Sequence, residues 1–113
     1  MLLFITSALL AIGAAFDGKS TVDFLTKSKG TMVEEDSIMI RLYGSDTPSP
    51  TRVWVTGTLC IGAEVGIAFL TSHLWHPIMW AFVVQQLIQA GYHLRCYVNN
   101  EAVLSSYLKS VQK

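Results

Sequence analysis

The chain has 113 residues, which is room for one domain, and 51% of them are hydrophobic while only 14% are charged. The apolar residues are gathered in blocks, a pattern typical of an all-α integral membrane protein rather than of a soluble core. The formal net charge is zero, so no general attraction to nucleic acid is indicated. No cysteine pattern for a metal and no glycine loop for a phosphate is present in the sequence.

Residues 1–16, MLLFITSALLAIGAAF, begin the first apolar segment and fit two interpretations. A cleaved signal peptide would normally carry a basic residue near its start and a small-residue cleavage site, and neither is evident before Lys19. A retained membrane helix needs more length, which residues 1–25 supply if the Lys19 side chain extends to the interface. Asp17 and Thr21 then share a face where the helix leaves the lipid. We favour the retained helix.

Residues 32–43 predict a short helix at the cytoplasmic membrane interface. Thr31 and Glu34 have capping-box spacing, and Gly44 is expected to end the helix. Carboxylates in a first turn oppose the positive end of the helix, so we interpret the acidic cluster as capping rather than as a metal site. Its members are Glu34, Glu35 and Asp36. The proline-containing residues 45–51 predict an extended connection.

Two further apolar runs, residues 53–72 and 77–97, are each predicted to span a bilayer, which takes about 20 residues of helix. The linker between them allows only an antiparallel helical hairpin. His73 and His76 at its tip have spacing for a shared metal, but no carboxylate or cysteine lies near them in sequence, and we favour interfacial anchoring. The tail, residues 98–113, is weakly amphipathic and is expected to lie on the membrane surface or to fray.

The distribution of basic residues predicts the orientation of these three spans. Of the eight Lys and Arg residues, five lie between the first and second spans and three follow the third. The N-terminus and the hairpin tip carry none. Because cytoplasmic loops are enriched in Lys and Arg, the predicted topology has the N-terminus outside and the C-terminus in the cytoplasm.

Glu64 is the only charged residue between 53 and 72. A carboxylate at the bilayer centre costs about 2.5 to 3.5 kcal/mol, so the group should be protonated or paired. With the tip centred between residues 74 and 75, Glu64 lies level with Gln85 and Gln86 on the returning helix. We therefore expect the Glu64 carboxyl, protonated, to form a hydrogen bond with a glutamine of the third span.

Three polar residues of the third span, Gln85, Gln89 and His93, are spaced four residues apart and are expected to form one polar stripe. Joined to Glu64, this stripe has two interpretations. The first is a structural contact that holds the hairpin together. The second is a proton or ion relay that runs from Glu64 through Gln89 to His93.

A second face of the helix over residues 53–72 carries small residues. Gly62 and Gly66 form a GxxxG motif, and Thr58 extends the row by one turn. Such rows let helices approach closely. These positions point away from Glu64, so this helix is expected to have two packing surfaces, one of them available to the first helix or to a partner.

Short motifs follow one another along the chain in the order Asp17, Thr21, Gly30, Glu34 or Glu35, Tyr43, Gly44, Trp75, Pro77, Gln89, His93 and Asn99. This order resembles a family of small uncharacterised bacterial multi-pass membrane proteins. The similarity covers roughly residues 15 to 100. It implies a location in the bacterial inner membrane and indicates no particular activity. Members often carry Glu-x-Asn-Pro after the first span, where this chain lacks the proline.

No nucleophile with a base, and no catalytic pair of carboxylates, has a usable spacing in the sequence. We therefore expect a non-enzymatic membrane subunit or scaffold, with no catalytic, cofactor or metal site, that packs against a larger membrane complex. The alternative is a small oligomeric transporter or proton-conducting protein that uses Glu64 and His93. The expected partners are the lipid bilayer and either a larger complex or further copies of the chain, and not nucleic acid.

Overall fold

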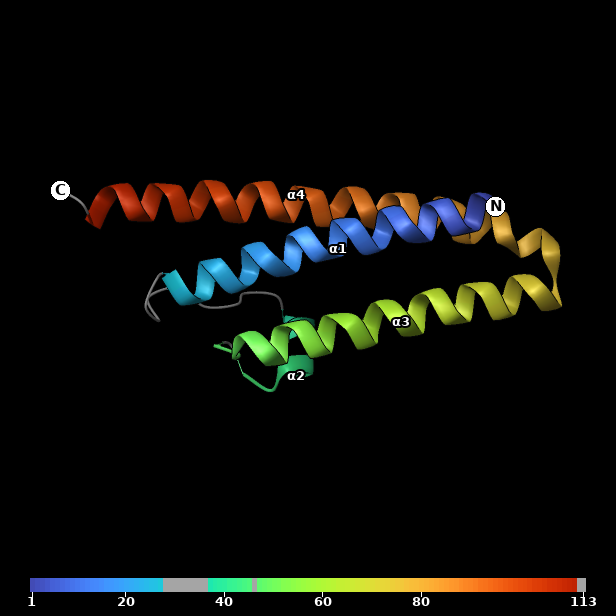
Figure 1. The fold of residues 1–113 in the computed structure, drawn as a ribbon, viewed down its shortest axis with the longest axis horizontal. Helices are drawn as coiled ribbons and strands as arrows, with labels where there is room; N and C mark the ends of the chain where they lie inside the picture. Colours follow the sequence, from blue (N-terminus) through green and yellow to red (C-terminus); the bar gives the residue numbers. More distant parts are fainter. Residues whose placement is uncertain (28–36, 46, 112–113) are drawn as a thin grey trace.

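The structure, a computed structural model, describes residues 1–27, 37–45 and 47–111. Over that part of the chain every regular element is a helix, which confirms the predicted all-α class (Figure 1). The elements are α1 (Leu2–Lys27), α2 (Ser37–Tyr43), α3 (Pro50–Leu74), the 3-10 turn η1 (His76–Ile78) and α4 (Met79–Val111).

Local sequence explains where these helices begin and end. At the start of α3 the Ser49 hydroxyl accepts a hydrogen bond from the backbone N–H of Arg52 at 3.2 Å, and Pro50 occupies the first turn, where its missing N–H costs nothing. Gly44 ends α2 with φ of 79°, a left-handed conformation that glycine adopts without strain. Trp75 is extended and separates α3 from η1. The predicted stop at Gly44 is confirmed.

The interfacial helix predicted over residues 32–43 is described only in part. Its second half is α2, whereas the capping box and the acidic cluster lie outside the described residues. The buried Tyr43 side chain belongs to a cluster with Leu25 of α1 and Val53 of α3. This contact fixes α2 against the ends of two long helices.

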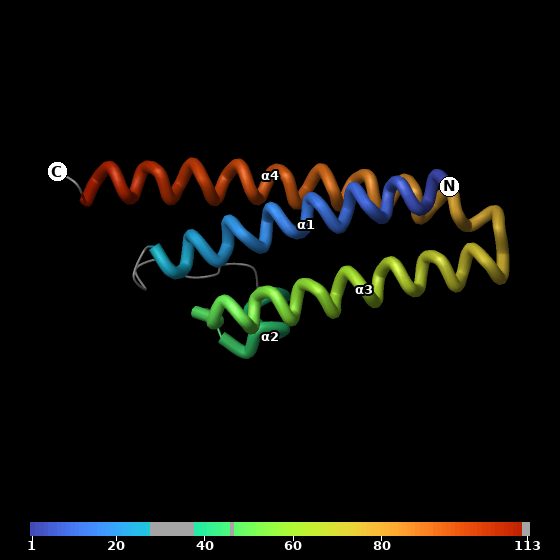
Figure 2. The backbone as a smooth tube through the Cα atoms, viewed as in Figure 1, coloured from blue at the N-terminus to red at the C-terminus, as the bar shows by residue number. Residues whose placement is uncertain are grey.

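The three long helices form an elongated body of 57 × 24 × 19 Å. As Figure 2 shows, α1 and α4 run side by side in the same direction, and α3 runs antiparallel to them. Contacts between α1 and α4 are more extensive than those that either helix makes with α3. The tight pair is therefore the parallel one, formed by the first and last helices, and not the α3–α4 hairpin that the short linker suggested.

Two apolar clusters tie α3 to this pair near its two ends. One cluster, at the hairpin tip, contains Leu3, Ala68 and Val83. The other cluster lies at the opposite end of α1, where Leu25 and Val53 pack together. Between them α3 is sparsely covered, since only 11% of its most apolar stretch is buried, against 28% for α1.

Among the described helices, two rather than three are long and apolar enough to cross a membrane, namely α1 and α3. The predicted third span, residues 77–97, covers the end of η1 and the first part of α4, whose apolar sequence is interrupted by glutamines and a histidine. Residues 98–111, expected to be a separate tail, continue α4 without a break to Val111. The tail is the second half of one helix.

Candidate functional site

The contact between α1 and α4, here called the seam, follows a regular pattern in both helices. Its positions are alternately three and four residues apart, the average of 3.5 that keeps one stripe of a helix against its neighbour. On α1 they are Leu3, Thr6, Leu10, Gly13, Asp17 and Ser20. On α4 they are Val83, Gln86, Ala90, His93, Tyr97, Asn100 and Leu104. Polar residues recur on α4 every seventh position, at Gln86, His93 and Asn100.

The first polar layer of the seam is closed around Gln86, whose side chain is 1% exposed. Its Oε1 accepts a hydrogen bond from the Thr6 hydroxyl at 2.6 Å, and its Nε2 donates to the Ser7 hydroxyl at 3.0 Å. Both ends of the amide therefore have partners on α1. A buried primary amide that is satisfied in this way fixes the register of the two helices, because a shift by one residue would leave it unpaired.

The second layer joins Asp17 and His93. The Nδ1 atom of His93 lies 2.7 Å from Oδ2 of Asp17, with the two side chains 24% and 20% exposed. A carboxylate only accepts hydrogen bonds, so Nδ1 must carry the proton in this contact whether the ring is neutral or charged. Asp17 thus selects the ring tautomer and leaves Nε2 of His93 for another group.

Between these layers the helix backbones come close together. A Cβ atom built on Gly13 would lie 3.2 Å from the carbonyl oxygen of Ala90 and 3.6 Å from Cβ of His93. Glycine at this position therefore permits the approach that brings Asp17 within reach of His93.

The third layer lies one heptad further along α4. Nδ2 of Asn100 donates to the Ser20 hydroxyl at 3.2 Å and to the Thr21 hydroxyl at 3.5 Å. Beyond it, α1 ends in exposed charges, with Lys19 and Lys27 at 3.5 and 4.0 Å from Asp23.

The contact of α3 with α4 contains one long hydrogen bond. Nε2 of Gln89 donates to Oε1 of Glu64 at 3.4 Å, close to the limit for such a bond. The other two polar atoms of this pair, Oε2 of Glu64 and Oε1 of Gln89, are shielded from solvent and have no hydrogen-bond partner. Both are acceptors, so the pair as it stands needs at least one more proton donor.

The polar residues predicted from the sequence are therefore divided among three partners. Glu64 contacts Gln89, Gln86 binds α1, and His93 binds Asp17, while Gln85 is exposed. The expected pairing of Glu64 with Gln85 or Gln86 is wrong by one helical turn. The pair 64 and 89 is symmetric about the bond between residues 76 and 77, inside η1, whereas the prediction centred the tip two residues earlier.

Thr6, Ser7, Ser20 and Asn100 were not predicted as site residues, and Asp17 was not matched to His93. The signal that identifies them is the seven-residue recurrence of polar side chains on α4. The four-residue spacing used for the predicted stripe includes Gln85 instead of Gln86, and so it does not identify the residues of α4 that face α1.

The small-residue row of α3 has no partner within the described chain. Cβ atoms built on Gly62 and Gly66 meet no heavy atom within 4 Å, and Thr58 is exposed. Gly57 is equally open. This face of α3 is therefore open, and α1 does not cover it.

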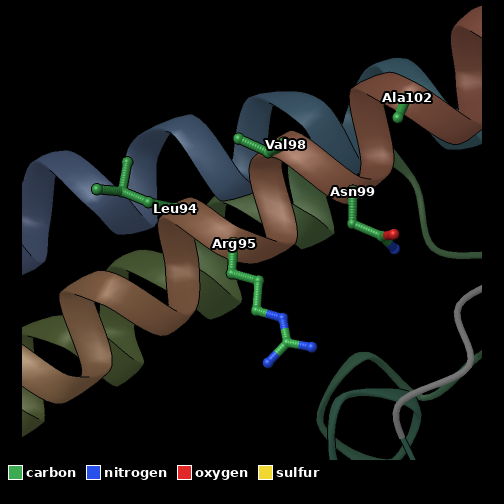
Figure 3. A pocket seen from close by; sticks show the side chains of 5 residues that line it. All are labelled: Leu94, Arg95, Val98, Asn99 and Ala102. Carbon is green, nitrogen blue, oxygen red and sulfur yellow. The ribbon is translucent and has the colours of Figure 1, made fainter.

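Two remaining features bear on ligand binding. His73 and His76 are exposed at the tip, and no group of three or more potential metal-ligating side chains occurs among the described residues. A shallow groove of about 500 Å³ runs along α4, and Figure 3 shows Arg95 and Asn99 extending from the same side of the helix beside it. Its other lining residues are Leu94, Val98 and Ala102.

No protein-family model, no curated protein and no solved structure matches this chain. The resemblance carried by its short motifs therefore stays a prediction, and its function has to be argued from the geometry of the helices.

Proposed function

We propose that the chain is an integral membrane protein in which α1, α3 and α4 each cross the bilayer. Support comes from the many large apolar side chains exposed on all three long helices, which water would not favour and lipid would. Three polar residues of α4, namely Gln86, His93 and Asn100, face α1 in the seam and have hydrogen-bond partners there. A helix whose polar groups are satisfied by its neighbour can cross a membrane without being apolar all round.

The proposed orientation has the N-terminus and hairpin tip outside and the C-terminus in the cytoplasm, following the distribution of Lys and Arg. The resemblance noted above makes the bacterial inner membrane the proposed location. Reporter fusions test the orientation. A reporter active only in the periplasm should be silent after Lys29 and at the C-terminus, and activity at either position would overturn the topology.

For the function itself we propose a non-enzymatic small subunit that docks onto a larger membrane protein. The observation that carries this proposal is the open face of α3, where Gly62 and Gly66 meet nothing within 4 Å and Thr58 is exposed. Small residues at such spacing allow a second helix to approach closely, and close packing is a main source of helix association in lipid.

Extraction in a mild detergent followed by mass spectrometry tests this function. A larger membrane protein should copurify in fixed stoichiometry with the wild type and be lost with Gly62→Leu. Gly91→Leu is the matched control, because this glycine on α4 is also open and lies on another helix. Recovery of the chain alone, as monomer or homo-oligomer, would contradict the proposal.

A second candidate function is proton or ion conduction by an oligomer, and a specific arrangement favours it. Glu64 contacts Gln89 at 3.4 Å, and His93, one turn further along α4, contacts Asp17 at 2.7 Å. The two contacts thus lie one helical turn apart on α4. Reconstituted liposomes decide the matter, since this function requires a flux that Glu64→Gln and His93→Gln abolish and that Gln85→Leu leaves unchanged.

A further inference from the structure

The Glu64–Gln89 contact lacks a hydrogen-bond donor, and its geometry indicates where that donor would be. Gln89 supplies one N–H to Oε1 of Glu64 at 3.4 Å. Oε2 of Glu64 and Oε1 of Gln89 remain without a donor, although both are buried. An ionised carboxylate has no proton to offer, so in that state it cannot satisfy the amide oxygen. Buried acceptors without partners are uncommon, and two in one contact call for a common cause.

We propose that Glu64 binds a proton, and that the resulting carboxylic acid and the Gln89 amide form a ring of two hydrogen bonds. The proton comes from water and adds to Oε2, which removes the carboxylate charge. The new O–H donates to Oε1 of Gln89, while Nε2 of Gln89 continues to donate to Oε1 of Glu64. A single proton thereby gives partners to both orphaned oxygens, with no further donor required.

Among the described residues, no Lys, Arg or His side chain forms an ion pair with Glu64. On α3 the titratable group nearest in sequence is Cys60, one turn away. On α4 the side chain of Tyr92 is exposed, and Nδ1 of His93 is already bound to Asp17. On α1 no charged side chain precedes Asp17, and Gly13 lies opposite Ala90 at this level. Neutralisation by a proton is therefore favoured over pairing with a cationic side chain.

A water molecule or a metal cation at the two acceptors would be the other ways to complete the contact. A hard cation such as calcium takes about six to eight oxygen ligands, and sites of three or more potential ligands are absent from the described part of the chain. A water would satisfy the oxygens but leave a charge inside the helix bundle. The proton is the ligand that removes both problems.

The site connects protonation to the position of α3. Along the middle of α3 there is little other packing, because its glycines are open and the apolar clusters lie near the ends. Loss of the proton would convert a two-bond contact into one with facing acceptors and would loosen this helix. The inference rests on the membrane placement proposed above and specifies the proton as ligand for the second candidate function.

Selective ¹³C labelling of the glutamate side-chain carboxyl carbons, observed by NMR on the full chain in detergent micelles, reads the protonation state directly. The Glu64 signal is identified by its loss in Glu64→Gln, and Glu101→Gln is the control that must leave it in place. At pH 7 the signal should have the chemical shift of a carboxylic acid. A carboxylate shift at pH 7, as water or a cation at the site would require, overturns the proposal.

Thermal unfolding in the same micelles tests the effect on α3. Glu64→Gln places a permanent N–H where the proposal puts the proton, so it keeps a two-bond ring at every pH. Raising the pH through the Glu64 transition seen by NMR should lower the unfolding temperature of the wild type more than that of Glu64→Gln. Equal changes in both proteins would disprove the ring. Because neither readout depends on flux or on a copurifying partner, failure here is distinct from failure of the proposed functions.

Discussion

Polar side chains of two helices meet both in the seam between α1 and α4 and in the contact of α3 with α4. The two regions differ in how many of these side chains have hydrogen-bond partners. In the seam every layer pairs a polar side chain of α4 with one or two on α1, at distances from 2.6 to 3.5 Å. At the α3 contact a single bond of 3.4 Å leaves two acceptors unpaired, and on another face of α3 Gly62 and Gly66 meet no neighbour.

This difference distinguishes a helix pair that stays packed from a helix whose packing depends on a further ligand or partner. In the membrane placement proposed above, lipid competes poorly for hydrogen bonds, so a helix pair whose polar groups are satisfied internally is not expected to separate. The α3 helix keeps apolar anchors near both ends but lacks satisfied groups in between. We infer that α1 and α4 form the fixed part of the molecule and that α3 is the part whose position depends on protonation or on a partner.

The largest expected effect comes from blocking the close approach in the seam. In Gly13→Leu the first added carbon already lies 3.2 Å from a backbone oxygen that cannot move alone. Overpacking of this kind costs about 1 to 3 kcal/mol, which denaturant titration in mixed micelles measures. Gly62→Leu introduces the same side chain at an open position of α3 and should leave the stability of the isolated chain unchanged. Equal losses in both variants would remove the distinction between the two contacts.

A smaller loss is expected when the first polar layer is opened. Gln86→Leu removes the partner of Thr6 and Ser7, and should lower stability by about 1 to 2 kcal/mol. The adjacent Gln85 is exposed, so Gln85→Leu should change stability by less than about 0.5 kcal/mol. If the two variants behaved alike, the polar stripe read at four-residue intervals would be correct and the seam would not.

The Asp17–His93 layer should show energetic coupling of about 1 kcal/mol in a double-mutant cycle with Asp17→Asn and His93→Gln. Each single change alters one side of the 2.7 Å contact, so that the double variant should lose less than the two changes added together. Additive losses would show that the contact contributes nothing to the seam.

The smallest effects are expected at the α3 contact. Glu64→Gln keeps a group that can pair with Gln89 and should change stability by less than about 0.5 kcal/mol, whereas Glu64→Leu leaves the amide without a partner and should cost about 0.6 kcal/mol or somewhat more. Unfolding of both variants at neutral pH provides the comparison. A loss in Glu64→Leu as large as in Gln86→Leu would mean that α3 is held as firmly as the seam.

Helix type and approximate limits were accessible from the sequence because they depend on local features. The long apolar runs and the glycine at position 44 act within a few residues of themselves. The extended connection predicted over residues 45–51 was too long, because Pro50 and Thr51 already form the first turn of α3. Helix pairing depends instead on which faces meet. The short linker at residues 73–77 favoured α3 and α4 as the tight pair, whereas α1 meets α4 across separations of 76 to 80 residues.

The sequence indicated some of the polar residues that meet between the helices, but it did not indicate which residue contacts which. Glu64, Gln86, Gln89 and His93 were selected because polar residues among apolar ones need partners. Predicting which of them pair requires the centre of the hairpin turn to within one residue. The 3-10 turn at the tip moved that centre away from the predicted position. Asp17 was interpreted as part of the helix end because nothing in its own neighbourhood points to His93.

The parallel arrangement of α1 and α4 has a consequence for biosynthesis. Thr6, Ser7 and Asp17 are made early, yet the side chains that bind them lie in a helix that emerges some 80 residues later. In the membrane placement proposed above, α1 therefore waits without its partners on α4 until both α3 and α4 have been made. Synthesis of α4, and not the insertion of α1, then becomes the step at which the seam can form.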